Sequence, residues 1–180
     1  FFSYFFSDKI VLWMYGAKEV SEKEQPLLHE LIGDVARRAK VPKPKVYLVT
    51  SANPNAFATG RSPQHAAVAA TTGILNLLSK EELHGVLAHE ISHVKNRDIL
   101  IASIAATLAG IIGFAGAMAR WSAILGTGDE ENGSGLLGLL VLGIITPVMA
   151  FLIQMAISRA REYQADESAA RLLGTPEGLI

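Results

Sequence analysis

Two long segments without a charged residue dominate what this chain can fold into. They cover Ile99–Ala119 and Leu136–Ile157, and each meets the requirement of about 20 apolar residues for a helix that spans a bilayer. A buried hairpin in a soluble protein is the alternative, but segments of this length are hard to bury in a chain of 180 residues. The sequence therefore predicts a transmembrane helical hairpin over residues 99–157, with an acidic, glycine-rich loop at residues 126–135.

Composition and charge exclude several classes of function. Half of the residues are hydrophobic and the mean hydropathy is +0.31, which agrees with a lipid bilayer as a partner. The formal net charge of −1 provides no basic surface, so no nucleic acid is expected as a partner. Because the chain has no cysteine, a metal would have to be held by His, Asp or Glu.

Basic residues flank the hairpin on one side and predict its orientation. Arg120 is the one basic residue at the opposite side, where the acidic loop lies. The positive-inside rule places the more basic side in the cytoplasm. We therefore expect a multi-pass protein of the cell (inner or cytoplasmic) membrane, with residues 18–98 facing the cytoplasm. The flanking basic residues are Lys95, Arg97, Arg159 and Arg161.

The hairpin is expected to interrupt a domain that is mainly α with a small β-sheet. Residues 1–15 are expected to be the end of a truncated transmembrane helix. Residues 18–98 form the first part of the domain, and residues 158–180 form its second part, also truncated. In that second part, Thr175 and Pro176 have the pattern of a helix start.

Two capping-box patterns predict helices within the first part. Ser21 with Glu24 precedes a helix whose apolar face runs from Leu27 to Ala39, and Ser79 with Glu82 precedes a second helix. The second helix is expected to continue into the apolar segment that begins at Ile99.

Two short strands are expected between these helices. They cover Lys45–Thr50 and Ala66–Thr72, and a loop is expected between them at Ser51–Gln64. The strand at Ala66–Thr72 has small side chains. It is either an edge strand that pairs with an extended peptide or an ordinary core strand, and the sequence leaves both interpretations open.

The sequence His89-Glu90-Ile91-Ser92-His93 carries the main chemical signal. Residues four apart share one face of a helix, so His89 and His93 can present imidazole nitrogens to one zinc ion. A bound zinc lowers the pKa of water, and Glu90 lies near enough to take the proton.

A catalytic zinc needs a third protein ligand, and no His follows His93. Among the downstream carboxylates, Glu162 is best placed because it follows the second apolar segment, which returns the chain to the side of the histidines. Asp166 is four residues further on and can orient a ligand imidazole. Asp98 is expected to be carried past the metal by its helix. A solvated, charged helix start is the alternative interpretation of the region around Glu162.

Three ordered motifs resemble the HtpX-type membrane zinc metalloproteases, which are relatives of the CaaX prenyl endopeptidases. The motifs are PNAFATG (Pro54–Gly60), HEISHVKNRD (His89–Asp98) and SRAREYQAD (Ser158–Asp166), with two apolar segments between the last two. The resemblance extends over nearly the whole chain. It implies a zincin-type, gluzincin-like catalytic domain that binds one zinc ion and hydrolyses peptide bonds of proteins.

The resemblance also implies roles for individual residues. His89, His93 and Glu162 would bind zinc, and Glu90 would be the general base. Asp166 would be a partner of a ligand histidine, His89, and Asn55 would lie near the substrate cleft. The family's link to membrane protein quality control and stress implies misfolded or membrane proteins as substrates.

Two other classes of function remain as alternatives. A membrane scaffold with a structural metal site would need a closed shell of four ligands, and the sequence offers three good ones. A metal transporter would place ligands inside the apolar segments, which contain no charged residue and no His. His65 and His84 are expected to be plain surface residues.

Overall fold

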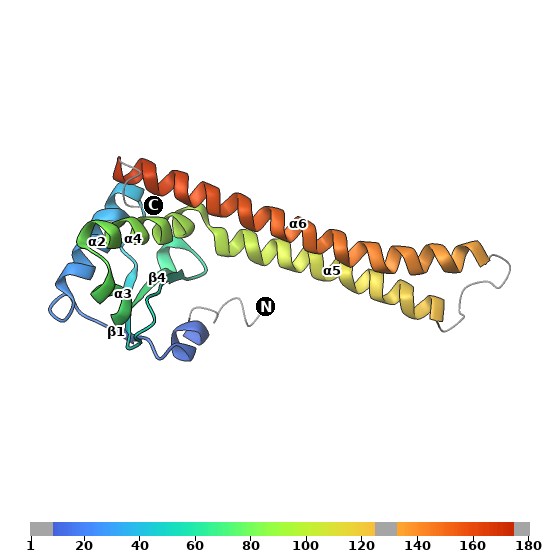
Figure 1. Cartoon of the computed structure of the whole chain (residues 1–180), viewed down its shortest axis with the longest axis horizontal. Coiled ribbons are helices and arrows are strands. Elements are labelled where there is room, and N and C mark those ends of the chain that lie inside the picture. The colour runs from blue at the N-terminus through green and yellow to red at the C-terminus, as the bar shows by residue number, and fades with distance from the viewer. Residues whose placement is uncertain (1–8, 125–132, 175–180) are drawn as a thin grey trace. The chain divides into compact units, whose positions relative to one another are not determined.

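The computed structural model of the chain describes residues 9–124 and 133–174. The chain divides into two compact units (Figure 1). The first unit comprises Phe1–Ile101 together with Arg161–Ile180, and the second comprises Ala102–Ala160. The described part is mostly helical with a small mixed sheet, as the sequence predicts.

A four-stranded sheet forms the centre of the first unit. Its strand order is β1-β2-β4-β3, with β2 and β4 parallel and the outer two pairs antiparallel. The predicted strands at residues 45–50 and 66–72 are β2 and β4. The strands are β1 (Lys18–Glu19), β2 (Lys45–Val49), β3 (Ala56–Thr59) and β4 (Ala67–Thr71).

Strand β3 corrects the expectation of a loop over Ser51–Gln64. It has only four residues and follows an Asn-Pro-Asn turn, so the turn signals hide it in the sequence. Within the described part, β3 is an edge of the sheet, whereas β4 is paired on both sides and all five of its residues are buried. The core interpretation of β4 is therefore correct, and the edge position belongs to β3.

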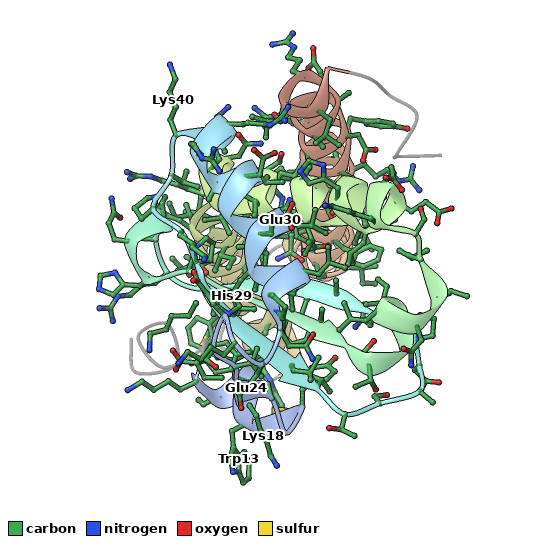
Figure 2. All side chains as sticks on the ribbon, turned by 90° about the vertical axis from the view of Figure 1, so that its left-hand side faces the viewer. Trp13, Lys18, Glu24, His29, Glu30 and Lys40 are labelled. Atoms are coloured by element: carbon green, nitrogen blue, oxygen red, sulfur yellow. The ribbon has the colours of Figure 1, made fainter. Side chains whose placement is uncertain are left out.

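Two helices cover one face of this sheet. Helix α2 (Pro26–Ala39) and helix α4 (Lys80–Asn96) bury side chains against Val46 of β2 and Val68 of β4. Figure 2 shows the side chain of Lys40, just after α2, projecting away from this core. The helix residues of this core include Leu28, Leu31, Ile32, Val35, Leu83, Leu87, Ala88 and Ile91.

The start of α2 differs in detail from the prediction. The main-chain N–H and the hydroxyl of Ser21 both donate to the Glu24 carboxylate at 2.7 Å, but the helix begins only at Pro26. Leu27 is exposed, whereas the next residue, Leu28, is buried in the core. The second capping box, at Ser79 and Glu82, is present at the start of α4.

The other face of the sheet is covered by the segment around Leu12. Leu12 is buried against Val49, Ala67 and Ala69, and residues 9–14 are helical. Trp13, in the same segment, is 82% exposed, and Figure 2 shows it pointing away from the unit. The prediction of a longer helix over residues 1–15 falls partly on residues 1–8, which lie outside the described part.

A break at Arg97 separates α4 from the next helix, α5 (Asp98–Ile124). Arg97 has φ +57°, and its main-chain N–H donates to the carbonyl of Val94. A residue in the left-handed region ends an α-helix, so the expected continuous helix from residue 79 into the apolar segment is wrong. The change of direction places Asp98 beside α4.

The second unit consists of parts of α5 and α6 (Gly133–Leu173). Both helices are long and apolar enough to cross a membrane, and large apolar side chains such as Phe114 and Phe151 are exposed. Pro147 lies inside α6. Residues 133–135 are helical, which shortens the expected acidic loop. Its residues 126–132, and the helix start expected at residue 175, lie outside the described part.

Helix α6 continues without a break past Arg161 into the first unit, where Ala165 and Ala169 are fully buried. This continuity brings the third sequence motif to the domain that contains the first two. The remaining described elements are a 3₁₀ turn at Pro63–His65 and helix α3 (Thr72–Leu77).

Candidate metal centre

Helix α4 presents His89 and His93 on one face, one turn apart. Their Nε2 atoms are 3.0 Å apart, and their rings meet edge to face with centroids separated by 4.7 Å. The helix is well specified at its N-terminus, since the capping box satisfies two main-chain donors and Glu81 and Glu82 complement the helix dipole. The local sequence thus fixes the relation between the two imidazoles.

Glu162, on α6, lies beside both histidines. Its Oε2 atom is 3.5 Å from His89 Nε2 and 3.7 Å from His93 Nε2. All three residues belong to the first unit, and their ligand atoms lie within 4.8 Å of one another. A tetrahedral zinc with bond lengths of about 2.0–2.1 Å separates its ligand atoms by roughly 3.3 Å, so the spacing fits such an ion.

The other ring nitrogens of the two histidines each contact a carboxylate. His89 Nδ1 is 2.8 Å from Asp166 Oδ1, and His93 Nδ1 is 2.5 Å from Asp98 Oδ2. An ionised carboxylate only accepts, so each Nδ1 carries the hydrogen and each Nε2 is directed to the position beside Glu162. A metal ion at this position would accept the Nε2 lone pairs of both rings, which are 3.0 Å apart.

Asp98 is the residue of this site that the sequence reasoning rejected. It is 5% exposed and lies beside His93 because the chain turns at Arg97. Its main-chain carbonyl also accepts a hydrogen bond from the Arg161 guanidinium at 2.7 Å. The sequence signal for this contact is that Asp98 follows His93 by five residues. A continuous helix would carry Asp98 past the metal, so the expectation of such a helix hid the contact.

Glu90 is half-buried and points to the edge of the sheet. Its Oε2 accepts a hydrogen bond from the main-chain N–H of Ala58, on β3, at 3.0 Å. Burial raises the pKa of the Glu90 carboxyl above its ordinary value. The Ala58 N–H and the two histidines oppose this rise, while Glu162 adds to it. A carboxylate with a raised pKa is a better proton acceptor than an exposed glutamate.

Asn55 is exposed and comes directly before β3. Its main-chain N–H donates to Thr71 Oγ1, and its carbonyl accepts from the Thr71 N–H, both at 2.9 Å. The main chain at Asn55 is therefore held at the start of the edge strand, three residues before Ala58.

The two other histidines noted in the sequence differ from each other. His65 is exposed, with Ser62 Oγ 2.9 Å from its Nδ1 atom. His84 is half-buried, and its Nε2 atom lies 3.2 Å from Asp34 Oδ2, so the expectation of a plain surface residue is wrong for His84. Burial lowers the pKa of His84.

The chain is similar to known peptidases over nearly its whole length. Residues 22–179 match the model of peptidase family M48. The chain is similar to the protease HtpX homologs of Sulfurihydrogenibium sp. (58% identity), Aquifex aeolicus (55%) and Pyrococcus furiosus (54%). These matches cover 98–99% of this chain and 60–62% of each relative, so the chain spans about 60% of the length of these relatives.

A solved structure shows the same fold at lower sequence similarity. The crystal structure of S. mikatae Ste24p matches with a TM-score of 0.67 and 22% identity. The match covers 94% of this chain and 44% of that protein.

Proposed function

Because the chain belongs to peptidase family M48, we propose that it carries the catalytic centre of a zinc-dependent membrane endopeptidase. The observation that carries the proposal is the meeting of His89, His93 and Glu162, since α4 and α6 bring the three ligand atoms together from distant parts of the sequence. Each histidine also has a carboxylate partner on its second nitrogen, as metal-binding histidines commonly do.

His89, His93 and Glu162 would hold one zinc ion per chain. When bound, the ion supplies Lewis-acid chemistry, which lowers the pKa of water and polarises a peptide carbonyl. Two imidazoles and a carboxylate are typical of catalytic zinc sites that leave one position open. Within the described residues, the group has no fourth His, Asp or Glu, which supports a catalytic site over a closed structural one.

Glu90 is the proposed general base. It follows a ligand histidine directly in the sequence, and its carboxylate is held at the sheet edge by Ala58. In this role Glu90 accepts the proton of the attacking water and passes it to the leaving amine. Asp166 and Asp98 hold the ligand imidazoles with the hydrogen on Nδ1, so that each Nε2 is free to bind the metal.

The edge strand β3 is the proposed binding surface for the substrate. The N–H of Ala58 points away from β4 and donates to Glu90, and within the described residues this side of β3 is not paired with another strand. An extended peptide can add to such an edge through main-chain hydrogen bonds, which place a scissile bond without regard to its side chains. Asn55, directly before the same strand, would contact this peptide.

We further propose that α5 and α6 cross the cytoplasmic membrane, with the metal centre on the cytoplasmic side. Their length and apolar surface support this, and the basic residues that flank the apolar segments support the orientation. A protease centre next to such helices suits misfolded or membrane proteins as substrates, in a role in quality control under stress.

Metal removal tests the proposed function. The full-length protein in detergent is expected to lose casein cleavage after treatment with a chelator and to regain it when about one equivalent of zinc is added per chain. Cleavage at an unchanged rate by protein shown to be metal-free would contradict a zinc peptidase. Addition of magnesium is the matched control, because it prefers oxygen ligands in an octahedral arrangement.

Asp98 provides a second test, because only the fold assigns it to the site. Asp98→Asn is expected to lower zinc affinity about 10–100-fold, since the amide no longer enforces the hydrogen on His93 Nδ1. The measurement is a competition titration with a chromophoric chelator. Glu30→Gln, which changes an exposed acid on α2, should leave the affinity unchanged. Equal affinities of Asp98→Asn and the parent would show that Asp98 does not orient His93.

A further inference from the structure

A polar bridge lies at the far end of the helix segment that carries Glu162. Arg38, on α2, donates from Nη1 to the main-chain carbonyl of Leu172 at 3.2 Å. Leu172 follows Glu162 by ten residues, which corresponds to about 15 Å along a helix axis. The contact is therefore remote from the metal centre, although it involves the same segment of α6.

This contact provides a hydrogen-bond donor for a main-chain carbonyl in the last turn of α6. The last carbonyls of an α-helix have no partner within the helix, and the helix dipole gives this end partial negative charge. At the end of α6, the main-chain N–H of Gly174 donates a hydrogen bond to the carbonyl of Ala170, and Gly174 has φ +78°. The Leu172 carbonyl accepts a hydrogen bond from the guanidinium of Arg38. The guanidinium supplies both the missing donor and a positive charge at the negative end of the helix dipole.

Arg38 is held in place by Asp34 of its own helix, which also contacts a second helix. Its Nε atom is 2.7 Å from Asp34 Oδ2, one turn earlier on α2. The same oxygen is 3.2 Å from Nε2 of His84, on α4. Asp34 thus lies between α4, which carries His89 and His93, and the arginine that contacts α6.

This part of α6 buries little apolar surface, so polar contacts contribute to holding it in place. Ala165 and Ala169 are fully buried, but an alanine side chain removes little apolar surface from water. Leu172 and Leu173 are only partly buried against the core. Arg161 holds the segment next to the metal centre by its bond to the Asp98 carbonyl, and Arg38 holds its other end.

We propose that Arg38, oriented by Asp34, is a positioning residue that keeps α6 docked so that Glu162 meets the two histidines. This inference rests on the proposed role of Glu162 as a metal ligand. Arg38 acts through the placement of the helix and touches neither metal nor substrate. An exposed ion pair usually contributes little to stability, so the test has to separate positioning from general stability.

The test measures the Zn²⁺ affinity of the metal-free full-length protein in detergent, by competition with a chromophoric chelator. Arg38→Ala is expected to weaken binding about 3–10-fold, the effect of one typical hydrogen bond, because the contact is exposed to solvent. Arg37→Ala is the matched control. Arg37 is the neighbouring, more exposed arginine and lies 3.9 Å from Asp34. Its replacement by alanine is expected to leave the Zn²⁺ affinity unchanged. Arg38→Lys should be intermediate, because an ammonium lacks the fork that spans both partners.

A double variant decides whether Arg38 acts through Glu162. In a Glu162→Ala background, Arg38→Ala should cause no further loss of Zn²⁺ affinity, whereas a general loss of stability would lower the affinity by the same factor in both backgrounds. The same factor in both, or no loss in the single variant, overturns the inference. If Glu162→Ala itself leaves the affinity unchanged, the proposed ligand role fails first, and the inference fails with it.

Discussion

Glu90→Gln is expected to lower the rate of casein cleavage by about 10²–10⁴-fold, which corresponds to roughly 3–5 kcal/mol in the activation barrier. Glutamine keeps the size of the side chain and can still accept the hydrogen bond of the Ala58 N–H. It cannot take a proton from water. Zinc affinity should remain within a few-fold of the parent, because Glu90 is not among the three residues that surround the metal position. The measurements are initial cleavage rates and a zinc titration on the same preparations.

Glu81→Gln is the matched control for this variant. Glu81 is on the same helix and is exposed in its first turn, so cleavage should stay at the parental rate. Cleavage by Glu90→Gln at the parental rate would exclude the general-base role. Loss of zinc along with activity would instead place Glu90 among the metal ligands.

Glu162→Ala is expected to have the second large effect, a loss of zinc affinity of about 10²–10³-fold. Structural zinc sites with four ligands bind with about 10–16 kcal/mol, so one ligand contributes on the order of 3–4 kcal/mol. Casein cleavage should fall at limiting zinc and recover in part at high zinc, because His89 and His93 remain 3.0 Å apart on α4. Isothermal titration of the metal-free protein measures the affinity.

Glu167→Ala is the control on the same helix. Glu167 is exposed and pairs with Arg171 at 2.6 Å on the surface of α6, so its removal should not change zinc affinity. If Glu162→Ala bound zinc as tightly as the parent, Glu162 would not be a metal ligand. The alternative interpretation of this region, a solvated and charged helix start, would then hold.

The local sequence predicts the proposed chemistry of this protein. The spacing of His89 and His93 specifies a helix face, and the capping box at Ser79 specifies where that helix starts. These are local properties, because hydrogen bonds and side-chain spacing within a helix depend on residues three or four apart. The uninterrupted apolar segments likewise specify α5 and α6, and the position of Glu162 after the second segment identified it as the third ligand candidate.

The groups that support this proposed chemistry are brought to the site by contacts across the whole fold. The sequence reasoning placed Asp98 on a continuous helix, and one left-handed residue, Arg97, moved it beside His93. Similarly, β3 is too short and too close to turn residues to be recognised, yet its pairing with β4 brings the Ala58 N–H to Glu90. Both outcomes depend on contacts between segments far apart in the chain or on a single backbone angle. Helical and strand periodicity describe the faces of regular elements, whereas a break in direction and the pairing of strands are settled by packing of the whole domain.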